Sequence, residues 1–275
     1  MEENILVAQS EGIATVTFNR PEQRNAISYH GWLQLRKIIS TLENDNSVRA
    51  VIFTGSGNKS FSAGADIKDF DSYRGNSKTA EDYAVAFDGA MDDAENMSKP
   101  TISLIRGFCV GGGCEFSMAT DIRIASPDSI FGIPIARLGI LVGYGEMRRL
   151  INLIGTGFAT YILLSGRLID AKEAVNMGLV TKLIQGSEIH DYTYSLAKEM
   201  SELAPLSHKR NKKIRDVVLR RTHLHNMTEE ERLLPITNFD SLDFNEGKKA
   251  FIERRKPRFI AVSYTHLTLP TSDLV

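Results

Sequence analysis

The chain of 275 residues lacks an excess of charge of either sign and has no hydrophobic run of membrane length. Its 33 basic and 34 acidic residues leave a formal net charge of -1, so no overall attraction favours a polyanion such as nucleic acid. No apolar run approaches the roughly 20 residues that cross a bilayer. The acidic start MEEN resembles neither a signal peptide nor an Arg-rich transit peptide. We therefore expect a cytoplasmic protein with no nucleic-acid or membrane partner.

Cysteine is also scarce, which excludes two further classes of protein. Cys109 and Cys114 are the only two cysteines, too few for a disulfide framework. Their spacing, with no paired histidine nearby, does not fit a zinc site, and we expect no bound metal. With 42% hydrophobic and 24% charged residues, the composition is that of an ordinary globular protein, long enough to bury a sizeable core.

The hydrophobic pattern predicts strands early in the chain and helices late. A turn signal at Ser10 to Gly12 separates two β-rich runs and predicts a hairpin. Apolar periodicity predicts helices over 25–42 and 82–97, and short apolar runs predict strands over 48–54, 101–107, 121–126 and 179–184. The polar stretch 69–81 between two of these elements is interpreted as a mobile loop. This order predicts an α/β fold with a helical C-terminal part.

Three segments are expected along the chain. Residues 1–195 form the core, 196–259 the helical part, and 260–275 a foreign or disordered tail. The tail differs from the dense ERRKPRF that precedes it because Asp273 is its only charged residue. A docking arm or strand is the alternative interpretation of this tail.

Residues 107–121, GFCVGGGCEFSMATD, combine three adjacent glycines with a glutamate among apolar residues. Each glycine inside regular structure costs about 0.5 to 1 kcal/mol of backbone entropy, which suggests that another group approaches the main chain closely. A helix beginning near Gly112 would present unpaired amides and the positive end of its dipole, which together bind anions. Glu115 lies in the first turn of that helix, within reach of a ligand bound there.

A second loop of small residues, FSAGAD at 61–66, also follows a predicted strand. If the amide of Ala63 faced the same oxygen as the amide of Gly112, the pair would form an oxyanion hole for a carbonyl that becomes an enolate. Glu115 would then move the protons. A simpler alternative remains open, since a glutamate at a helix N-terminus is favoured by the helix dipole alone.

Five segments, in this order along the chain, resemble the enoyl-CoA hydratase/isomerase, or crotonase, superfamily. They are RPEQRNAI at 20–27, FSAGADIKDF at 61–70, the glycine stretch at 107–121, FGIPIARLGI at 131–140 and LLSGRLIDAKEAVNMGLV at 163–180. The resemblance covers most of residues 5–259 and implies a crotonase-like spiral of ββα turns followed by helices that trimerise. It also implies a homotrimer or homohexamer and an acyl-CoA thioester substrate, with coenzyme A as part of that substrate and no other cofactor.

The resemblance also implies roles for particular residues. Ala63 and Gly112 would supply the two oxyanion amides, and Glu115 falls on the first catalytic glutamate, which orients and activates water. The residues implied to contact the coenzyme A portion of the substrate are Ala65, Asp66 and Ile67 along its channel, together with Arg24 and Ala26.

The sequence departs from the family pattern at two positions. Hydratases place a second glutamate directly after the proline of FGxP, and here that substrate-lining position is Ile135, which cannot exchange a proton. In GYGEMRRL at 143–150, Glu146 stands where the family usually has glycine. Glu146 either reaches the site from that loop or is a solvated or salt-bridged glutamate beside Arg148 and Arg149.

These observations favour hydration of a 2-enoyl-CoA by way of a thioester enolate, with Glu115 as acid and base. Double-bond isomerisation, or decarboxylation of a malonyl-type thioester, is an alternative because it needs only one carboxylate. A second alternative is a member that binds acyl-CoA, or RNA through the basic run HKRNKKIR at 208–215, without turnover.

Overall fold

The computed structural model describes residues 4–221 and 223–260, so the predicted tail lies outside the described residues apart from its first position. The chain divides into two compact units, Met1–Ser201 and Glu202–Val275. The expected boundary at residue 195 falls inside helix α7 (Ile189–Ser201), which belongs as a whole to the first unit. Its buried residues Ile189 and Ala197 pack on the first unit's sheet, which is why the division comes at the end of this helix.

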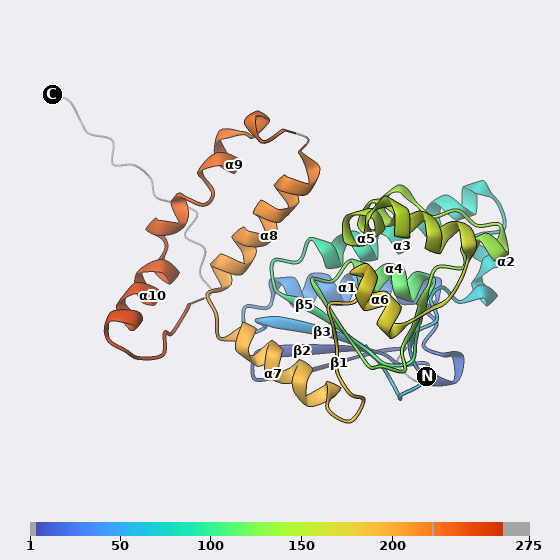
Figure 1. Cartoon of the computed structure of the whole chain (residues 1–275), viewed down its shortest axis with the longest axis horizontal. Coiled ribbons are helices and arrows are strands. Elements are labelled where there is room, and N and C mark those ends of the chain that lie inside the picture. Colours follow the sequence, from blue (N-terminus) through green and yellow to red (C-terminus); the bar gives the residue numbers. More distant parts are fainter. Residues whose placement is uncertain (1–3, 222, 261–275) are drawn as a thin grey trace. The chain divides into compact units, whose positions relative to one another are not determined.

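The larger sheet of the first unit has six strands in the order β1-β2-β3-β5-β7-β10 (Figure 1). Its strands are β1 (Ile5–Ser10), β2 (Ile13–Phe18), β3 (Ala50–Gly55), β5 (Thr101–Ile105), β7 (Ile122–Ala125) and β10 (Lys182–Leu183). β1 and β2 form the predicted antiparallel hairpin, and every later neighbour pairs in parallel. Parallel neighbours need crossover connections, which the helices and a second sheet supply.

The smaller sheet has four strands in the order β4-β6-β8-β9. They are β4 (Ser60–Ser62), β6 (Phe108–Val110), β8 (Ile130–Gly132) and β9 (Ile169–Asp170). Each strand of the larger sheet from β3 to β7 is followed in the chain by one strand of the smaller sheet, and then by a helix. This repetition is the predicted spiral of ββα turns.

Helices and short 3₁₀ turns fill the connections of the first unit. The helices are α1 (Tyr29–Asn44), α2 (Phe70–Tyr73), α3 (Ser77–Glu95), α4 (Gly112–Met118), α5 (Tyr144–Ser165), α6 (Ala171–Met177) and α7. The 3₁₀ turns are η1 (Pro21–Gln23), η2 (Ile67–Asp69) and η3 (Ile135–Leu138). Among the helices of the described residues, none is both long and apolar enough to cross a membrane.

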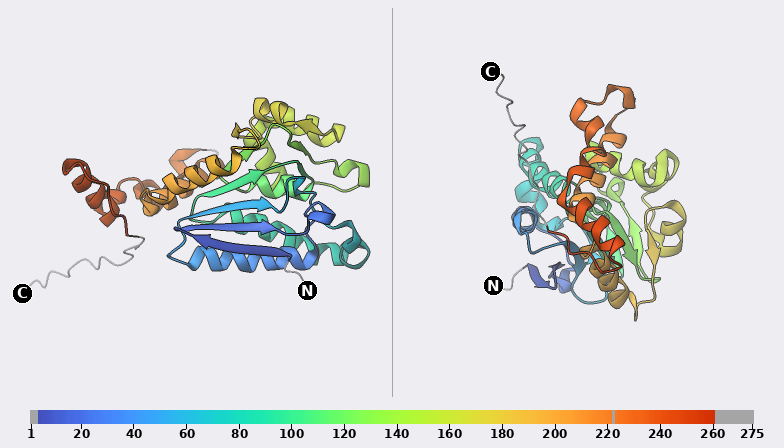
Figure 2. Two further views of the ribbon diagram at one scale, coloured as in Figure 1. Left: turned by 90° about the horizontal axis from the view of Figure 1, so that it is seen from below. Right: turned by 90° about the vertical axis from the view of Figure 1, so that its left-hand side faces the viewer.

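Both faces of the larger sheet are covered, which explains the unbroken apolar run of β3. Successive side chains of a strand point to opposite faces. Val51 and Phe53 accordingly belong to the main core with α1, α3 and α4, whereas Ala50 and Ile52 pack in a second core beneath α7. Figure 2 shows α1 and α7 on either side of these strands.

Helix α1 begins later than the sequence pattern predicted. Ser28 caps it by accepting a hydrogen bond from the amide of Gly31 at 3.1 Å. Asn25, expected to be helical, is instead buried with φ at 56°. Its Nδ2 donates to the carbonyls of Ser56 at 3.0 Å and Ser60 at 2.7 Å. These bonds tie the segment before α1 to the chain that follows β3.

The interpretation of residues 69–81 as a mobile loop is wrong. The segment contains α2 and the first turn of α3. Asn76 forms a capping box with Thr79, in which each side chain accepts a hydrogen bond from the backbone amide of the other residue. Capping satisfies amides that a helix start would leave unpaired, and a polar Asn, Ser, Lys and Thr sequence can therefore begin a helix.

The second unit contains α8 (Pro205–Arg220), α9 (Glu229–Leu233) and α10 (Leu242–Ile252), together with η4 (Leu224–Asn226) and η5 (Thr237–Asp240). This confirms the helix-rich C-terminal part. The carboxylate of Asp243 joins α10 to α8 by accepting from the amide of Leu206 at 3.2 Å.

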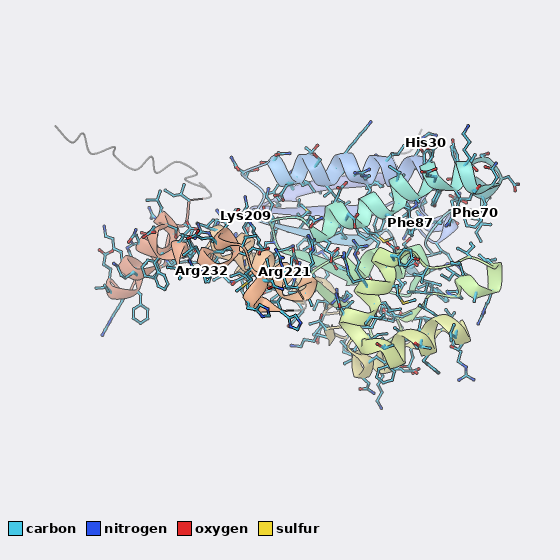
Figure 3. All side chains as sticks on the ribbon, turned by 90° about the horizontal axis from the view of Figure 1, so that it is seen from above. His30, Phe70, Phe87, Lys209, Arg221 and Arg232 are labelled. Carbon is cyan, nitrogen blue, oxygen red and sulfur yellow. The ribbon has the colours of Figure 1, made fainter. Side chains whose placement is uncertain are left out.

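The basic run 208–215 lies on α8, where Figure 3 labels Lys209. Acidic residues of the same unit neutralise part of this run. Lys213 pairs with Glu230 at 2.5 Å, and Arg215 pairs with Asp216 at 2.9 Å. Because these cations already have carboxylate partners, the run offers less positive charge to RNA phosphates than its sequence suggests.

Candidate active site

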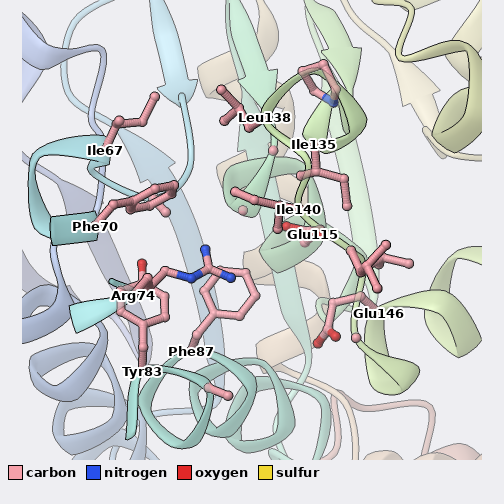
Figure 4. Close-up of a pocket in the computed structure, with 18 of the residues that line it drawn as sticks. Ile67, Phe70, Arg74, Tyr83, Phe87, Glu115, Ile135, Leu138, Ile140 and Glu146 are labelled. Carbon is pink, nitrogen blue, oxygen red and sulfur yellow. The ribbon is translucent and has the colours of Figure 1, made fainter. Parts of the chain in front are cut away.

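A cavity of about 340 Å³ lies between the glycine stretch, α3 and the chain around η3 and α5 (Figure 4). One wall carries Ile67, Phe70, Arg74 and Tyr83, and the other carries Ile135, Leu138, Ile140 and Glu146. Its further lining comes from Ala63, Ala65, Ala84, Phe87, Asp88, Val110, Gly111, Gly112, Glu115, Pro134, Leu141, Val142 and Gly143. The predicted residues Ala63, Ala65, Ile67, Gly112, Glu115 and Ile135 are therefore brought together in one place.

The two small-residue loops touch each other at this cavity. Gly64 has φ at +89°, and a β-carbon on it would lie 2.5 Å from the amide nitrogen of Gly112. A β-carbon on Gly112 would lie 3.3 Å from the amide nitrogen of Ala65 and 2.8 Å from the ring of Phe87. Glycine at both positions therefore lets the loops meet and leaves open the space in front of the amides.

The expected role of Ala63 as an oxyanion donor is wrong, because its amide is already engaged. The Ala63 amide donates to the carbonyl of Arg24 at 2.9 Å. The amide of Ala65 is better suited to this role. Among residues 4–221 and 223–260, neither this amide nor the amide of Gly112 has a hydrogen-bond acceptor. Ile27 bonds to the residues on either side of Ala65 and holds that amide in place. The pair of free amides at the cavity thus belongs to Ala65 and Gly112.

Glu115 lies in the first turn of α4 with only 5% of its surface exposed. Its carboxyl group makes no hydrogen bond or ion pair with the part of the chain that the structure describes. Desolvation, and then the negative charge of Glu146, raise the pKa of Glu115 to about 8, against a smaller lowering by Arg74. An unpartnered carboxyl group with a pKa near neutrality is suited to proton transfer.

The raised pKa of Glu115 predicts how the free energy of unfolding changes with pH. The folded protein retains this proton up to about pH 8, whereas the unfolded chain loses it near pH 4.5, so the stabilisation is complete below pH 4.5 and is lost as the pH rises through 8. A Glu115→Gln variant cannot ionise there. We expect urea unfolding to show that the free energy of unfolding of this variant, relative to that of the wild type, rises by on the order of 3 kcal/mol between pH 5 and pH 9. An equal dependence on pH in both proteins would contradict the raised pKa.

Glu146 is buried rather than solvated, so the solvated alternative is wrong. It lies in the first turn of α5 with 1% of its surface exposed. It pairs with Arg149 at 3.2 Å, whereas Arg148 faces Glu95 at 3.8 Å. Glu146 also lines the cavity. Salt-bridging and access to the site, which the sequence presented as alternatives, therefore occur together.

Three of the predicted substrate-binding residues lie beside the cavity but not in its lining. Arg24 packs its guanidinium over the ring of Phe108 at 4.9 Å. Asp66 pairs with Arg20 at 2.8 Å, and Arg20 donates to the carbonyl of Ala26 at 2.9 Å. These bonds join the segment around η1 to the loop that carries Ala65. Contact of Arg24, Ala26 or Asp66 with coenzyme A stays a prediction.

The sequence interpretation missed the part of the cavity that α2 and α3 provide. Arg74 lies over the rings of Phe70 and Tyr83, at 5.1 and 4.7 Å. Asp88 lines the cavity from α3, and desolvation, followed by the charges of Glu146 and Asp92, raises its pKa to about 6. The available signal was Asp88 itself, an acidic residue one helical turn after the apolar Ala84.

Comparisons with known proteins identify the family of the chain. The family model described as "Enoyl-CoA hydratase/isomerase" matches residues 8–261. A short-chain-enoyl-CoA hydratase of Clostridium acetobutylicum is 38% identical over 77% of this chain and 81% of its own length. A crotonyl-CoA hydratase of Syntrophomonas wolfei is 33% identical over 94% of this chain and 98% of its own.

Solved structures show the same fold. The crystal structure of an enoyl-CoA hydratase/carnithine racemase from Magnetospirillum magneticum matches with a TM-score of 0.90 and 33% identity, over 95% of this chain and 97% of that one. An enoyl-CoA hydratase from Bacillus anthracis matches with a TM-score of 0.88 and 29% identity, over 94% and 100% of the two chains. The chain belongs to the enoyl-CoA hydratase/isomerase family.

Proposed function

We propose that this enzyme adds water across the double bond of a 2-enoyl-CoA thioester. One observation carries the proposal: the buried carboxyl group of Glu115 shares a cavity with the amides of Ala65 and Gly112, and none of the three has a hydrogen-bond partner among the described residues. The relatives named short-chain-enoyl-CoA hydratase and crotonyl-CoA hydratase support this reaction and a short acyl group.

The two amides would act on the thioester carbonyl. When oxygen adds at C3, the electron pair of the C2–C3 double bond moves toward that carbonyl and leaves an enolate oxygen. The amides of Ala65 and Gly112 would donate to this oxygen, and one such donor is worth about 100- to 1000-fold in rate. Glu115, with its pKa near 8, is largely protonated at neutral pH and would supply the proton that C2 receives.

The thioester itself accepts the electron pair during this reaction, so we propose that no cofactor other than the coenzyme A of the substrate is needed. The segment around η1 and the loop of Ala65, Asp66 and Ile67 would hold the coenzyme A portion.

For the assembly we propose a homotrimer or homohexamer formed by way of the helical second unit, and for the location the cytoplasm.

Ile135 favours a second candidate reaction. This residue lines the cavity where many hydratases have a second glutamate, and an apolar side chain cannot transfer a proton. Moving a double bond from C3 to C2 needs only the amide pair and one group that takes a proton and returns it. Decarboxylation of a malonyl-type thioester needs still less, because carbon dioxide leaves the electron pair on C2.

An assay with three substrates separates these reactions. We expect the purified protein to hydrate crotonyl-CoA, measured by the loss of the enoyl absorbance. Faster conversion of a 3-enoyl-CoA to the 2-enoyl isomer would favour the isomerase, and release of carbon dioxide from methylmalonyl-CoA would favour the decarboxylase. Binding of these thioesters without turnover of any would favour the non-catalytic alternative.

A further inference from the structure

Hydration needs two proton transfers, and the cavity contains a second glutamate, Glu146, that can carry out one of them. Water must lose a proton as its oxygen bonds to C3, and C2 must gain one. Glu146 lines the same cavity as Glu115, from the first turn of α5 rather than from the loop after β8. The negative charge of Glu146 is the largest cause, after desolvation, that raises the pKa of Glu115 and of Asp88. Its carboxylate therefore lies close to both groups.

A set of ion pairs holds the carboxylate of Glu146 in one orientation. Its Oε1 accepts from Nη1 of Arg149 at 3.2 Å. The Arg149 side chain, 2% exposed, is fixed in turn by Glu95, at 3.0 Å from Nε and 2.7 Å from Nη2, and by Asp92. The oxygens of a carboxylate accept hydrogen bonds, and a carboxylate positioned beside a water molecule can take a proton from it.

The second oxygen of Glu146 is not used by Arg149. Oε2 lies against Gly143, where a β-carbon would come within 2.3 Å of it. Gly143 also lines the cavity. Among the described residues, no donor bonds to this oxygen. A water molecule in the cavity can therefore donate to Oε2 while Oε1 stays paired.

We propose that Glu146 is the second catalytic residue of the hydration: its carboxylate takes a proton from the attacking water, the role that the resemblance implies for Glu115, and Glu115 gives the proton that C2 receives. This inference rests on the proposed function. The O–H bond of water breaks as its oxygen bonds to C3, and its proton goes to Glu146. The double-bond electron pair forms the enolate, and C2 then takes the proton of Glu115. Transfer of the proton from Glu146 to Glu115, through water in the cavity, restores the starting state, so no other reagent is consumed.

The two glutamates differ in what else they can do, and the experiment uses that difference. In the proposed mechanism only Glu115 exchanges a proton with C2, so exchange of the C2 protons of butanoyl-CoA with D2O, followed by NMR, reports on Glu115 and the amide pair without any water addition. For Glu146→Gln we expect kcat for crotonyl-CoA hydration to fall by about 100-fold or more, with KM and the C2 exchange rate within about threefold of wild type. For Glu115→Gln we expect both reactions to be lost.

Two further variants distinguish catalysis by Glu146 from a structural role. Asp93→Asn removes the partner of Arg36 on the same helix α3, outside the cavity lining, and should leave hydration within about threefold of wild type. Placing a carboxylate at the apolar position, by Ile135→Glu in the Glu146→Gln background, should restore at least about tenfold of the lost hydration rate. Retained thioester binding and an unchanged melting temperature show that the Glu146→Gln protein is folded.

Several results would overturn the inference. Hydration by Glu146→Gln at the wild-type rate would exclude Glu146 as a catalytic residue. The same conclusion would follow if hydration were lost instead in Asp88→Asn, which removes the third carboxylate of the cavity. Equal losses of hydration and C2 exchange in Glu146→Gln would show that Glu146 only maintains the structure. If the wild type exchanges C2 protons but does not hydrate crotonyl-CoA, the proposed function fails, whatever Glu146 does.

Discussion

Replacing Glu115 by glutamine is expected to lower kcat for crotonyl-CoA hydration by about 100- to 10,000-fold, the largest effect of any single substitution in this chain. Glutamine keeps the size and hydrogen-bonding capacity of the side chain but cannot give or take a proton. Glu115 is buried and makes no bond with the described part of the chain. The substitution therefore removes no hydrogen bond or ion pair with the described residues, and we expect KM to change by no more than about threefold.

A matched control for this substitution is Glu173→Gln, which changes an acidic residue in the first turn of α6. Glu173 is not among the residues that line the cavity, so hydration should stay within about twofold of wild type. Initial rates at saturating substrate, over pH 5 to 9, give kcat for both variants. Hydration by Glu115→Gln at more than about one-tenth of the wild-type rate would show that another group transfers the proton to C2.

The fold could largely be predicted because its signals are local. The hairpin, the buried strands β3 and β5 and the capped helix α6 all follow from runs of a few residues. Asp170 accepts from the amide of Glu173 at 2.8 Å, and Gly178 ends α6 in a left-handed conformation with φ at 89°. Residues 69–81 are the exception, because two local signals conflict there. Their polar composition predicts a loop, whereas the capping pattern at Asn76 and Thr79 begins a helix.

The candidate site was less predictable because it depends on contacts between distant loops. Which amide of the FSAGAD loop faces the cavity is decided by the hydrogen bond from Ala63 to the carbonyl of Arg24, in a segment much earlier in the chain. The position of Glu146 depends likewise on Arg149 and on its partners in α3. The local sequence indicates the pair of Glu146 with Arg149, but neither the bond of Ala63 to Arg24 nor the pairs of Arg149 with α3 leave a pattern in it, because they join distant segments.

Adding one methyl group at Gly112 is expected to lower kcat for hydration by about 100-fold, the loss typical of removing one oxyanion donor. In Gly112→Ala the new β-carbon would lie 3.3 Å from the amide nitrogen of Ala65, in the space that the carbonyl oxygen must enter. The amide of Gly112 itself is kept. Gly157→Ala is the matched control, because a β-carbon there meets no atom within 4 Å, and it should leave kcat unchanged.

The same methyl group would also lie 2.8 Å from the ring of Phe87, so displacement of that ring is a competing cause of any loss. The double variant Gly112→Ala with Phe87→Leu separates the two causes, since it relieves the contact with the ring but leaves the methyl group in front of the Ala65 amide. If blocking the amide is responsible, the double variant stays about 100-fold slow while Phe87→Leu alone stays within about tenfold of wild type. Recovery of the double variant to the rate of Phe87→Leu would assign the loss to the ring and remove the Ala65 amide from the reaction.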